Sequence, residues 1–348
     1  MILTFLNELK QKLNKKKLIS SYRNKITKIL VSMGETNKNL LGTSSIVAEN
    51  NNDYASLDWH KAYCIANDLE SPNYVPEDFY YAEVEPHLNN FDYAKPYMDK
   101  SYFGFLLQEG DYIGNEYFYI EGQFYSGDGS AVTLNNVETW AVKQNEIVFK
   151  PAVDTGGGRG IHIGKSADIL PIIKSSEERF LIQTVQTQHE GMAVFHPDSL
   201  NTIRLMTLRK EGEIVPLSAV YRVGVGASRV DNQAAGGISC GIDERGCLRE
   251  FAYDKNLKKC KVHPTTEKVF LGAEIPNWSG VIEVALRNHR RLTEFDIISW
   301  DIAINAEGIA QIIEFNLLSQ EINFLQINNG PLFSEHTEWL LSKMTSKN

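Results

Sequence analysis

The sequence feature that most constrains the fold is a pair of apolar segments near the C-terminus. Residues 297–304 and 309–315 are short, mostly apolar runs, and residues 305–308 between them end on a glycine, as tight turns often do. Two such runs joined by a turn predict an antiparallel β-hairpin within a packed sheet. Each run contains a single charged residue, Asp301 in the first and Glu314 in the second.

The polar side chains of this hairpin are predicted to share one face. If the turn centres on Ala306–Glu307, Asp301 lies opposite Ile312, and directly opposed residues point to the same side. Alternation along the strand puts Glu314 and Asn316 on that side as well. Such groups are costly in an apolar sheet unless something compensates them, and oxygen ligands alone suit Mg²⁺. The pattern therefore predicts a magnesium site, with ion pairs to nearby lysines or arginines as the alternative.

The rest of the chain also consists of short strands, turns and separate helices. Its 348 residues are 43% hydrophobic, enough to bury the cores of two or three lobes. Because strands and helices do not alternate regularly, as they would around a parallel sheet, the predicted fold class is α+β with largely antiparallel sheets. Strands are predicted at 146–150, 161–163, 179–185, 203–208 and 214–221, and a helix at 281–291, after helices and loops in 31–95.

Composition and charge exclude several classes of protein. The four cysteines include no C-x-x-C pair, which disfavours a disulfide framework or a zinc site and indicates a reducing compartment. No apolar run approaches the roughly 20 residues that cross a bilayer, and Met1–Leu6 is too short for a secretion signal. We therefore expect a cytoplasmic protein. The net charge of −9 argues against nucleic acid as a partner.

The charge is unevenly distributed along the chain. Residues 1–30 contain eight lysines and arginines and one glutamate, a net charge of +7, which leaves −16 on the remainder. Apolar residues recur among these lysines at roughly helical spacing, as in a basic amphipathic helix. Such a helix can lie on an anionic membrane surface, which would place the protein at the inner face of the membrane. The alternative is a helix that packs on its own protein through its leucines.

Two motifs resemble catalytic signatures but lack a required element. Gly160–Ser166 (GIHIGKS) resembles a phosphate-binding P-loop, but Arg159 stands where that motif needs a glycine. Gly237–Gly241 (GISCG) matches the nucleophile elbow of hydrolases, which needs a strand before its serine and a helix after it. Glycines precede this motif and a turn-forming segment, 243–246, follows it. We therefore interpret 237–241 as a flexible glycine loop.

A lysine and a glycine-rich loop follow each other closely in the middle of the chain. Lys150 ends the strand predicted at 146–150, and residues 155–160 read TGGGRG. Glycines let a backbone approach phosphate groups closely, and Arg159 would add a second cation. A plain hairpin with a solvated lysine and arginine is the alternative. The glycines of this loop are Gly156, Gly157, Gly158 and Gly160.

The order of these features, a lysine, a glycine-rich loop and a strand pair with Asp301, Glu314 and Asn316, resembles the ATP-grasp superfamily. Within it, the chain is similar to the sugar-transfer-associated ATP-grasp family. That similarity extends over about residues 71–330, most of the chain. It rests on residues 199–204 (SLNTIR), 231–237 (DNQAAGG), 300–302 (WDI) and 313–316 (IEFN), and on Asp99-Lys100 before an aromatic-rich segment.

The resemblance implies an ATP-grasp fold, in which two α+β lobes with largely antiparallel sheets hold ATP between them. A helical N-terminal region would precede these lobes. The corresponding division of the chain is 1–70 for the basic helical region, 71–182 for the part with the glycine-rich loop, and 183–345 for the lobe with the magnesium strands.

The resemblance also implies which residues bind the cofactors ATP and Mg²⁺. Asp301, Glu314 and Asn316 would hold one or two Mg²⁺ ions. The lysines and the loop would contact the phosphates, and the segment 183–185 would lie beside the adenine. The residues implied to bind the nucleotide are Lys100, Lys150, Gly156, Gly157, Gly158, Arg159, Gly160, Gln183, Thr184 and Val185.

Further residues are implied to act between the nucleotide and the acceptor. Arg204 would contact the γ-phosphate or an acyl phosphate, and a cross-strand ion pair is the alternative for this residue. Arg222, Asp231 and Asn232 lie in or before a glycine-rich segment that could cover the acceptor pocket. Most members of the superfamily activate a carboxylate as an acyl phosphate, which an amine then attacks.

The implied function is an ATP- and Mg²⁺-dependent carboxylate–amine ligase. The family name points to glycan assembly, for example the joining of an amino acid to a uronic acid of a surface polysaccharide. The expected partners are therefore a small or sugar-linked carboxylate and an amine. Two alternatives stay open: an ATP-grasp kinase that phosphorylates a hydroxyl group, and a nucleotide-binding scaffold of a glycan-assembly complex without turnover.

Overall fold

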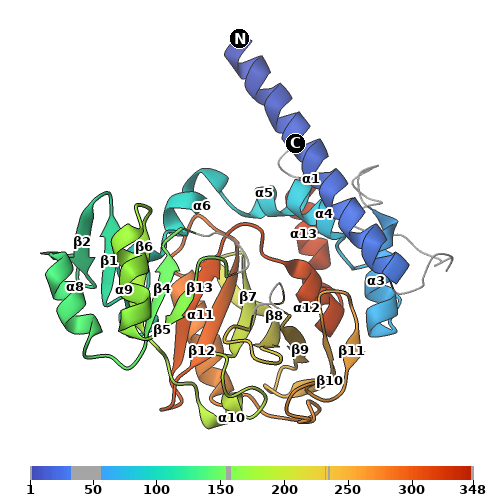
Figure 1. Cartoon of the computed structure of the whole chain (residues 1–348). Coiled ribbons are helices and arrows are strands. Elements are labelled where there is room, and N and C mark those ends of the chain that lie inside the picture. Colours follow the sequence, from blue (N-terminus) through green and yellow to red (C-terminus); the bar gives the residue numbers. More distant parts are fainter. Residues whose placement is uncertain (1, 33–55, 154–157, 232, 234–235, 346–348) are drawn as a thin grey trace.

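Two antiparallel sheets, each covered by helices, form two α+β lobes of unequal size (Figure 1). The computed structural model describes residues 2–32, 56–153, 158–231, 233 and 236–345, and only the backbone of residues 2–12 and 32. Every strand pairing within the two sheets is antiparallel. This architecture confirms the predicted α+β fold class.

The smaller lobe is a six-stranded sheet with the strand order β3-β2-β1-β6-β4-β5. Helices α8 (Leu134–Ala141) and α9 (Ser166–Ser175) pack against it. The lobe has its own core, in which Ile169 of α9 clusters with Phe149 and Phe180 of the sheet. Its strands are β1 (Tyr117–Ile120), β2 (Gln123–Ser126), β3 (Ala131–Val132), β4 (Ile147–Pro151), β5 (His162–Gly164) and β6 (Phe180–Thr184).

The larger lobe is a seven-stranded sheet with the strand order β11-β10-β9-β8-β7-β12-β13. Its strands are β7 (Thr202–Lys210), β8 (Glu213–Val223), β9 (Ile238–Ile242), β10 (Leu248–Tyr253), β11 (Lys259–Cys260), β12 (Ile297–Ile304) and β13 (Ala310–Asn316). Its helices are α3 (Leu57–Asn67), α4 (Glu77–Phe79), η1 (Tyr80–Val84), α5 (Glu85–Leu88), α6 (Phe91–Tyr97), η2 (Lys100–Tyr102), α7 (Phe103–Leu106), α10 (Glu190–Ala193), α11 (Trp278–His289), α12 (Ile322–Asn329), η4 (Ser334–His336) and α13 (Thr337–Thr345).

Both faces of the larger sheet are buried because its strands alternate between two cores. Ile203 and Leu205 of β7 belong to the core that contains α11, whereas Met206 and Leu208 belong to the core that contains α12 and α13. By the same alternation, Arg204 lies on the face that carries α12. This face is therefore apolar under the helices and polar toward the start of β7.

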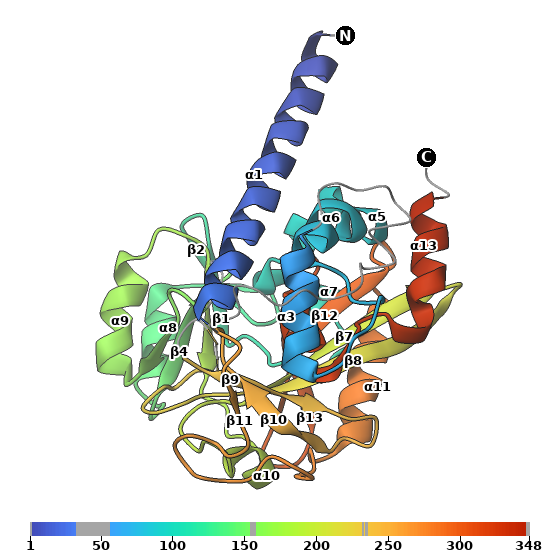
Figure 2. The ribbon, with the colours of Figure 1, turned by 90° about the vertical axis from the view of Figure 1, so that its right-hand side faces the viewer.

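The N-terminal helix α1 (Ile2–Ser32) docks on the larger lobe with its C-terminal half and projects beyond it at its N-terminal end (Figures 1 and 2). Ile19, Ile26, Ile29 and Leu30 are buried against α3 and its neighbours, whereas Leu13 stays 52% exposed. The described side chains of the helix thus pack on its own protein through three isoleucines and Leu30, whereas Leu13 and Leu18, which the sequence suggested, stay exposed. No described helix is long and apolar enough to span a membrane.

The interpretation of residues 237–241 as a flexible loop is wrong. Residues 238–242 form β9, an inner strand between β8 and β10, in which Ser239 is fully buried. Gly241 lies on this strand because α12 packs close to it: a Cβ atom there would come within 2.3 Å of the Asn329 side chain. The glycine therefore permits close packing of a helix on a sheet, and the buried serine is no exposed nucleophile.

Candidate active site

A cavity of about 950 Å³ lies between the two lobes. Strands β4, β5 and β6 of the smaller lobe and β7, β8, β12 and β13 of the larger lobe contribute side chains to it. Of the predicted site residues that the structure describes, all but Gly160 line this cavity. Gly156, Gly157 and Asn232 lie outside the described residues.

The strand register brings the predicted metal ligands together, though not as predicted. Asp301 lies opposite Glu314, and Asn316 lies opposite Ser299, so all three ligands share one face of the hairpin. The predicted pairing of Asp301 with Ile312 is wrong. The hairpin loop is one residue longer than assumed, since Asn305 pairs with Ile309. A register shift between Asp301 and Ile302 adds a second residue on β13, so the two changes together move the partner of Asp301 from Ile312 to Glu314.

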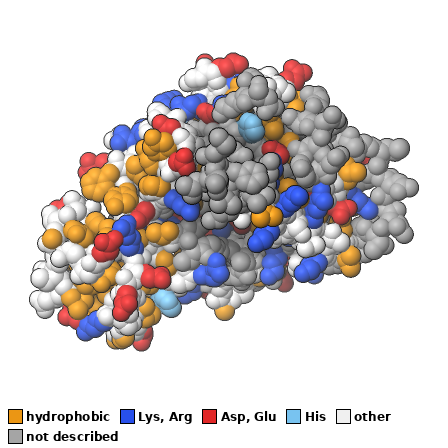
Figure 3. All heavy atoms as spheres, turned by 90° about the horizontal axis from the view of Figure 1, so that it is seen from above, with side chains coloured by type: hydrophobic (Ala, Val, Ile, Leu, Met, Phe, Trp, Pro, Cys, Tyr) orange, Lys and Arg blue, Asp and Glu red, His pale blue; other side chains and the backbone are white. Residues whose placement is uncertain are grey.

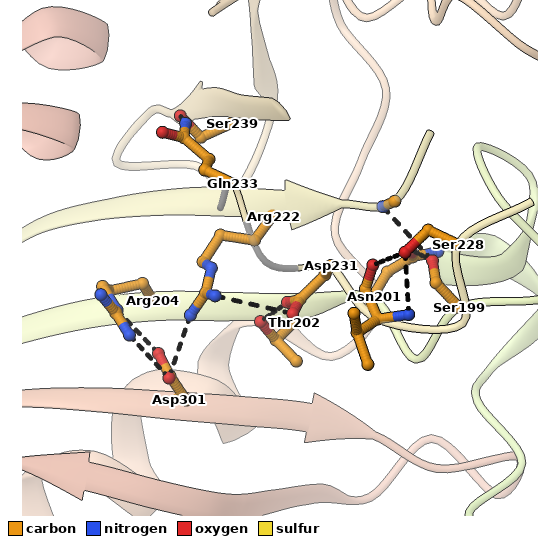
Figure 4. A network of polar contacts seen from close by, with 12 residues as sticks. Ser199, Asn201, Thr202, Arg204, Arg222, Ser228, Asp231, Gln233, Ser239 and Asp301 are labelled. Atoms are coloured by element: carbon orange, nitrogen blue, oxygen red, sulfur yellow. Dashed lines mark hydrogen bonds and ion pairs between the residues drawn. The ribbon is translucent and has the colours of Figure 1, made fainter. Parts of the chain in front are cut away.

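Asp301 is bound by two arginines from neighbouring strands (Figure 4). Arg204 lies directly opposite it on β7 and donates from Nε to Oδ1 at 2.8 Å and from Nη2 to Oδ2 at 2.7 Å. Arg222 on β8 donates from Nη1 to Oδ2 at 3.0 Å. Burial alone would raise the pKa of Asp301, but the two guanidinium groups outweigh it and hold the pKa well below its usual range. The cross-strand ion pair that was the alternative for Arg204 is thus present.

The second carboxylate near Arg222 is Asp231, in the segment between β8 and β9. Arg222 Nη2 lies 3.6 Å from Asp231 Oδ1, and the hydroxyl of Thr202 donates a hydrogen bond to the same carboxylate (Figure 4). Burial raises the pKa of Asp231, and the charge of Arg222 opposes that rise. Arg222 therefore links two carboxylates, one on β12 and one in the loop that borders the cavity.

Two lysines approach the cavity near Glu314. Lys100 Nζ lies 3.3 Å from Glu314 Oε2, and the backbone N–H of Lys100 donates to the carbonyl of Ala152 just after β4. Lys150 on β4 is buried, and its burial, together with the nearby charge of Lys100, lowers its pKa to about 8. A lysine that is this easily deprotonated gains most from an anionic ligand, because the ligand stabilises its charged form.

The side-chain amide of Gln183, at the end of β6, is used for hydrogen bonds within the protein and is not free to bind a ligand. The side-chain amide of Gln183 donates to the carbonyls of Ile113 and Gly114 and to Asn115 Oδ1. Its side chain is therefore used to join β6 to the segment that enters the smaller lobe. Thr184 and Val185, which follow it, line the cavity at the position predicted for the adenine.

The predicted magnesium ligands fit a hard cation that keeps several water ligands. Their donors are oxygens only, and the buried amide nitrogen of Asn316 has no hydrogen-bond partner among the described residues, so the protein does not lock this amide. Within the described part of the chain, no three His, Cys, Asp or Glu side chains gather closely enough to hold a metal by themselves. Oδ2 of Asp301 accepts from both arginines, whereas Oδ1 accepts from Arg204 alone and keeps one lone pair for a cation.

Four charged residues that line the cavity were not expected from the sequence: Glu146, Asp198, Arg229 and Glu321. Glu321, just before α12, binds Arg204 Nη1 through Oε2 at 2.5 Å. Glu146, just before β4, forms a two-pronged ion pair with Arg229, at 2.8 and 2.9 Å. Glu146 begins the strand predicted at 146–150 but was given no role there, and Glu321 lies in a loop whose course the sequence pattern does not reveal.

A comparison with known families matches just under half of the chain. Residues 168–339 match the model of a family described as sugar-transfer associated ATP-grasp. With its two antiparallel α+β lobes around a shared cavity, the chain has the ATP-grasp fold. The predicted resemblance to the sugar-transfer-associated family is confirmed over the matched residues. A comparison with curated proteins finds no match.

Solved structures with a similar fold include ATP-grasp ligases, all at low identity. The ligase PsnB in complex with a minimal precursor is 13% identical, with a TM-score of 0.43, over 73% of this chain and 64% of that chain. D-alanyl-alanine synthetase A from Vibrio cholerae is 12% identical, with a TM-score of 0.41, over 72% and 65%. D-alanine–D-alanine ligase from Bacillus anthracis is 13% identical, with a TM-score of 0.41, over 72% and 66%. The chain thus covers less than two thirds of each of these proteins.

Proposed function

We propose that this chain is an ATP- and Mg²⁺-dependent ligase that activates a carboxylate as an acyl phosphate and joins it to an amine. The observation that carries the proposal is the arrangement of Lys100, Lys150, Arg204 and Arg222 around one interlobe cavity that also contains three oxygen ligands. Such chemistry needs charge neutralisation and positioning rather than a protein nucleophile. The match to a sugar-transfer-associated family supports a sugar carboxylate, such as a uronic acid, as the substrate.

The residues of the chain would act according to their positions. Lys150 and Lys100 would bind the phosphates of the nucleotide, beside Thr184 and Val185 at the adenine. Asp301, with Glu314 and Asn316, would hold Mg²⁺, which neutralises phosphate charge when it is bound. Arg204 and Arg222 would then be available to bind the anionic substrate in place of Asp301.

The test is the release of ADP and phosphate from ATP and Mg²⁺ with a pool of uronic acids and a pool of amino acids. Each pool is omitted in turn, and Lys150→Ala is the control. Release that needs both pools and is lost in the variant supports the ligase. ADP formed with a single hydroxyl-bearing acceptor, with phosphate kept on the product, would instead show a kinase. Tight ATP binding without any turnover would favour the scaffold.

The exposed side of the middle of α1 supports a place at an anionic membrane surface. Lys16 and Lys17 are exposed there beside the exposed Leu13 and Leu18, and several Lys and Arg side chains lie in the right half of the view from above (Figure 3). Basic and apolar side chains together favour a surface of acidic lipids. Co-sedimentation with phosphatidylglycerol vesicles, but not with phosphatidylcholine vesicles, would support this location. Replacement of Lys16 and Lys17 by glutamate should abolish it.

A further inference from the structure

An unusual turn places a carboxylate in the cavity just after the magnesium hairpin. Ser319 and Glu321 both have left-handed backbone conformations, with φ values of 56° and 58°. Residues with side chains rarely adopt this conformation, because the Cβ atom crowds the backbone. Two such residues within one tripeptide persist only where the surroundings hold them, and such strain is typical of functional sites. Both residues line the cavity.

Three buried groups hold this turn. The carboxylate of Glu85 faces the backbone N–H groups of Ser319 and Gln320, and its burial raises its pKa to about 8. The backbone N–H of Glu321 donates to the hydroxyl of Tyr81 at 2.8 Å. The hydroxyl of Tyr80 donates to the side chain of Gln320 at 2.5 Å. Side chains of α5 and η1 thus fix the conformation of residues 319–321.

The carboxylate that this turn presents is more than a counter-ion for Arg204. Asp301 already binds Arg204 with both of its oxygens, whereas Glu321 meets the same guanidinium with one oxygen. Its side chain remains 49% exposed at the cavity. It also belongs to no cluster of three acids that could hold a metal in the described part of the chain. Glu321 is therefore a negative charge that can meet a cation entering the cavity.

We infer that Glu321 binds the ammonium group of the acceptor and receives a proton from it; this inference depends on the ligase function proposed above. Glu321 adjoins Arg204, which is proposed to hold the acyl phosphate, so an amine bound to Glu321 lies near the carbon that it attacks. The carboxylate of Glu321 first takes one proton from the ammonium group, which frees the lone pair of the nitrogen. The nitrogen forms a C–N bond with the acyl carbon, the C–O bond to phosphate breaks, and phosphate leaves with the electron pair. Bond formation lowers the pKa of the nitrogen, and its second proton leaves with the phosphate.

The experiment separates activation of the carboxylate from attack by the amine. The carboxylate is whichever of glucuronate, galacturonate and mannuronate supports ADP release by the unaltered protein. Hydroxylamine traps the acyl phosphate as a hydroxamate and is neutral at pH 7, so it needs no ammonium site. Amino acids provide the acceptor for the complete reaction. Glu321→Gln keeps the shape of the side chain, and Glu335→Gln alters a glutamate that is 85% exposed on η4 as the control.

We expect Glu321→Gln to form hydroxamate within about threefold of the unaltered protein. We also expect it to lose about 100-fold in kcat/KM for the amino acid, with a higher KM for that acceptor. Glu335→Gln should change neither reaction. Equal losses in both reactions would show that Glu321 only positions Arg204, which would overturn the inference and leave the ligase intact. Absence of hydroxamate from the unaltered protein with every uronate would overturn the ligase and the inference together.

A second variant tests the turn rather than its carboxylate. Tyr81→Phe removes the hydroxyl that accepts the N–H of Glu321 and leaves the aromatic ring in place. We expect the KM for the amino acid to rise by about three- to tenfold, while hydroxamate formation stays unchanged. An unchanged KM would contradict the view that this turn positions the acceptor-binding carboxylate.

Discussion

Asp301 is held by two guanidinium groups in a buried environment, whereas the side chain of Glu314 is 32% exposed and pairs with one ammonium group, that of Lys100. Removing one member of a buried ion pair leaves an uncompensated charge, which costs about 3–5 kcal/mol. An ion pair with a partly exposed member contributes less, and about 0–1 kcal/mol where both members lie at the surface. Two side chains with the same proposed role in metal binding therefore differ in their contribution to stability.

We expect Asp301→Asn to lower the free energy of unfolding by about 3 kcal/mol, because Arg204 and Arg222 then share no carboxylate between them. Glu314→Gln should lower it by less than about 1 kcal/mol. Urea unfolding followed by circular dichroism, in the presence of EDTA, measures both without a contribution from metal binding. Equal effects of the two substitutions would contradict this assignment of the buried ion pairs.

The charge of Lys150 should make nucleotide binding depend on pH. Burial lowers its pKa to about 8, so the ammonium form that is proposed to bind phosphate is present below that pH and is lost above it. We expect the Kd for ATP to be steady near pH 7 and to rise by up to about tenfold per pH unit above pH 8. Lys150→Arg keeps its charge and should show no such rise in isothermal titration calorimetry between pH 7 and 9.

Whole strands were predictable from the sequence where their burial produces a short run of apolar residues. The strand predicted at 297–304 coincides with β12, and those at 146–150 and 179–185 coincide with β4 and β6 to within one residue at each end. β9 was missed because glycines in a sequence suggest a flexible loop. In the structure Gly241 lies on a strand and allows α12 to pack closely against it. The composition of a segment shows whether it is apolar, but not which neighbour packs against it.

The candidate site was predictable as a set of residues but not as a geometry. Alternation along β13 was enough to place Glu314 and Asn316 on one face, whereas the pairing of Asp301 depends on a register shift within the hairpin. Glu321 could not be predicted, because its place in the cavity follows from two left-handed residues that are not glycines. Local exceptions to the usual backbone preferences decide the details of the site.

The docking of α1 includes an ion pair that should respond to pH. Lys25 Nζ lies 3.0 Å from the buried carboxylate of Glu77, and burial raises the pKa of Glu77 to about 7 despite that partner. The folded protein thus binds this proton more tightly than the unfolded chain does. The contribution of Glu77 to stability is therefore greatest at low pH and declines as pH rises from about 4.5 to about 7.

We expect Glu77→Gln to flatten this decline. At pH 5 the variant should melt close to the unaltered protein, because Glu77 is then protonated and uncharged. At pH 8 the variant should melt at the higher temperature, because no ionised carboxylate is buried under α1. Differential scanning calorimetry at the two pH values measures the comparison. A variant that is destabilised more at pH 8 than at pH 5 would show that the ion pair with Lys25 outweighs the cost of burial.

At the scale of the whole molecule, ion pairs join the two lobes, and the pair of Arg229 with Glu146 is the one considered for closure of the cavity. Arg229 belongs to the loop after β8 in the larger lobe, and Glu146 precedes β4 in the smaller lobe. Both side chains are partly exposed, so the pair contributes little to stability but holds the lobes together where both line the cavity. Its strength should therefore influence how widely the cavity opens.

We expect Arg229→Glu to open the lobes, because two like charges then face each other. The radius of gyration from small-angle X-ray scattering should increase at 20 mM salt. The exchange of both residues, Arg229→Glu with Glu146→Arg, should restore the compact value. High salt should reduce the difference between the variants, because salt screens exposed charges. An identical radius in all three proteins would show that other contacts control closure.

The way the smaller lobe joins the rest of the chain also bears on how such a protein can be altered. Residues 117–184 form their own sheet and core, and the segments by which they enter and leave are held side by side, since Gln183 hydrogen-bonds to the carbonyls of Ile113 and Gly114. A unit with adjacent ends can be exchanged without threading the chain through its host. A chimaera could therefore receive the smaller lobe of one relative and keep the larger lobe of another.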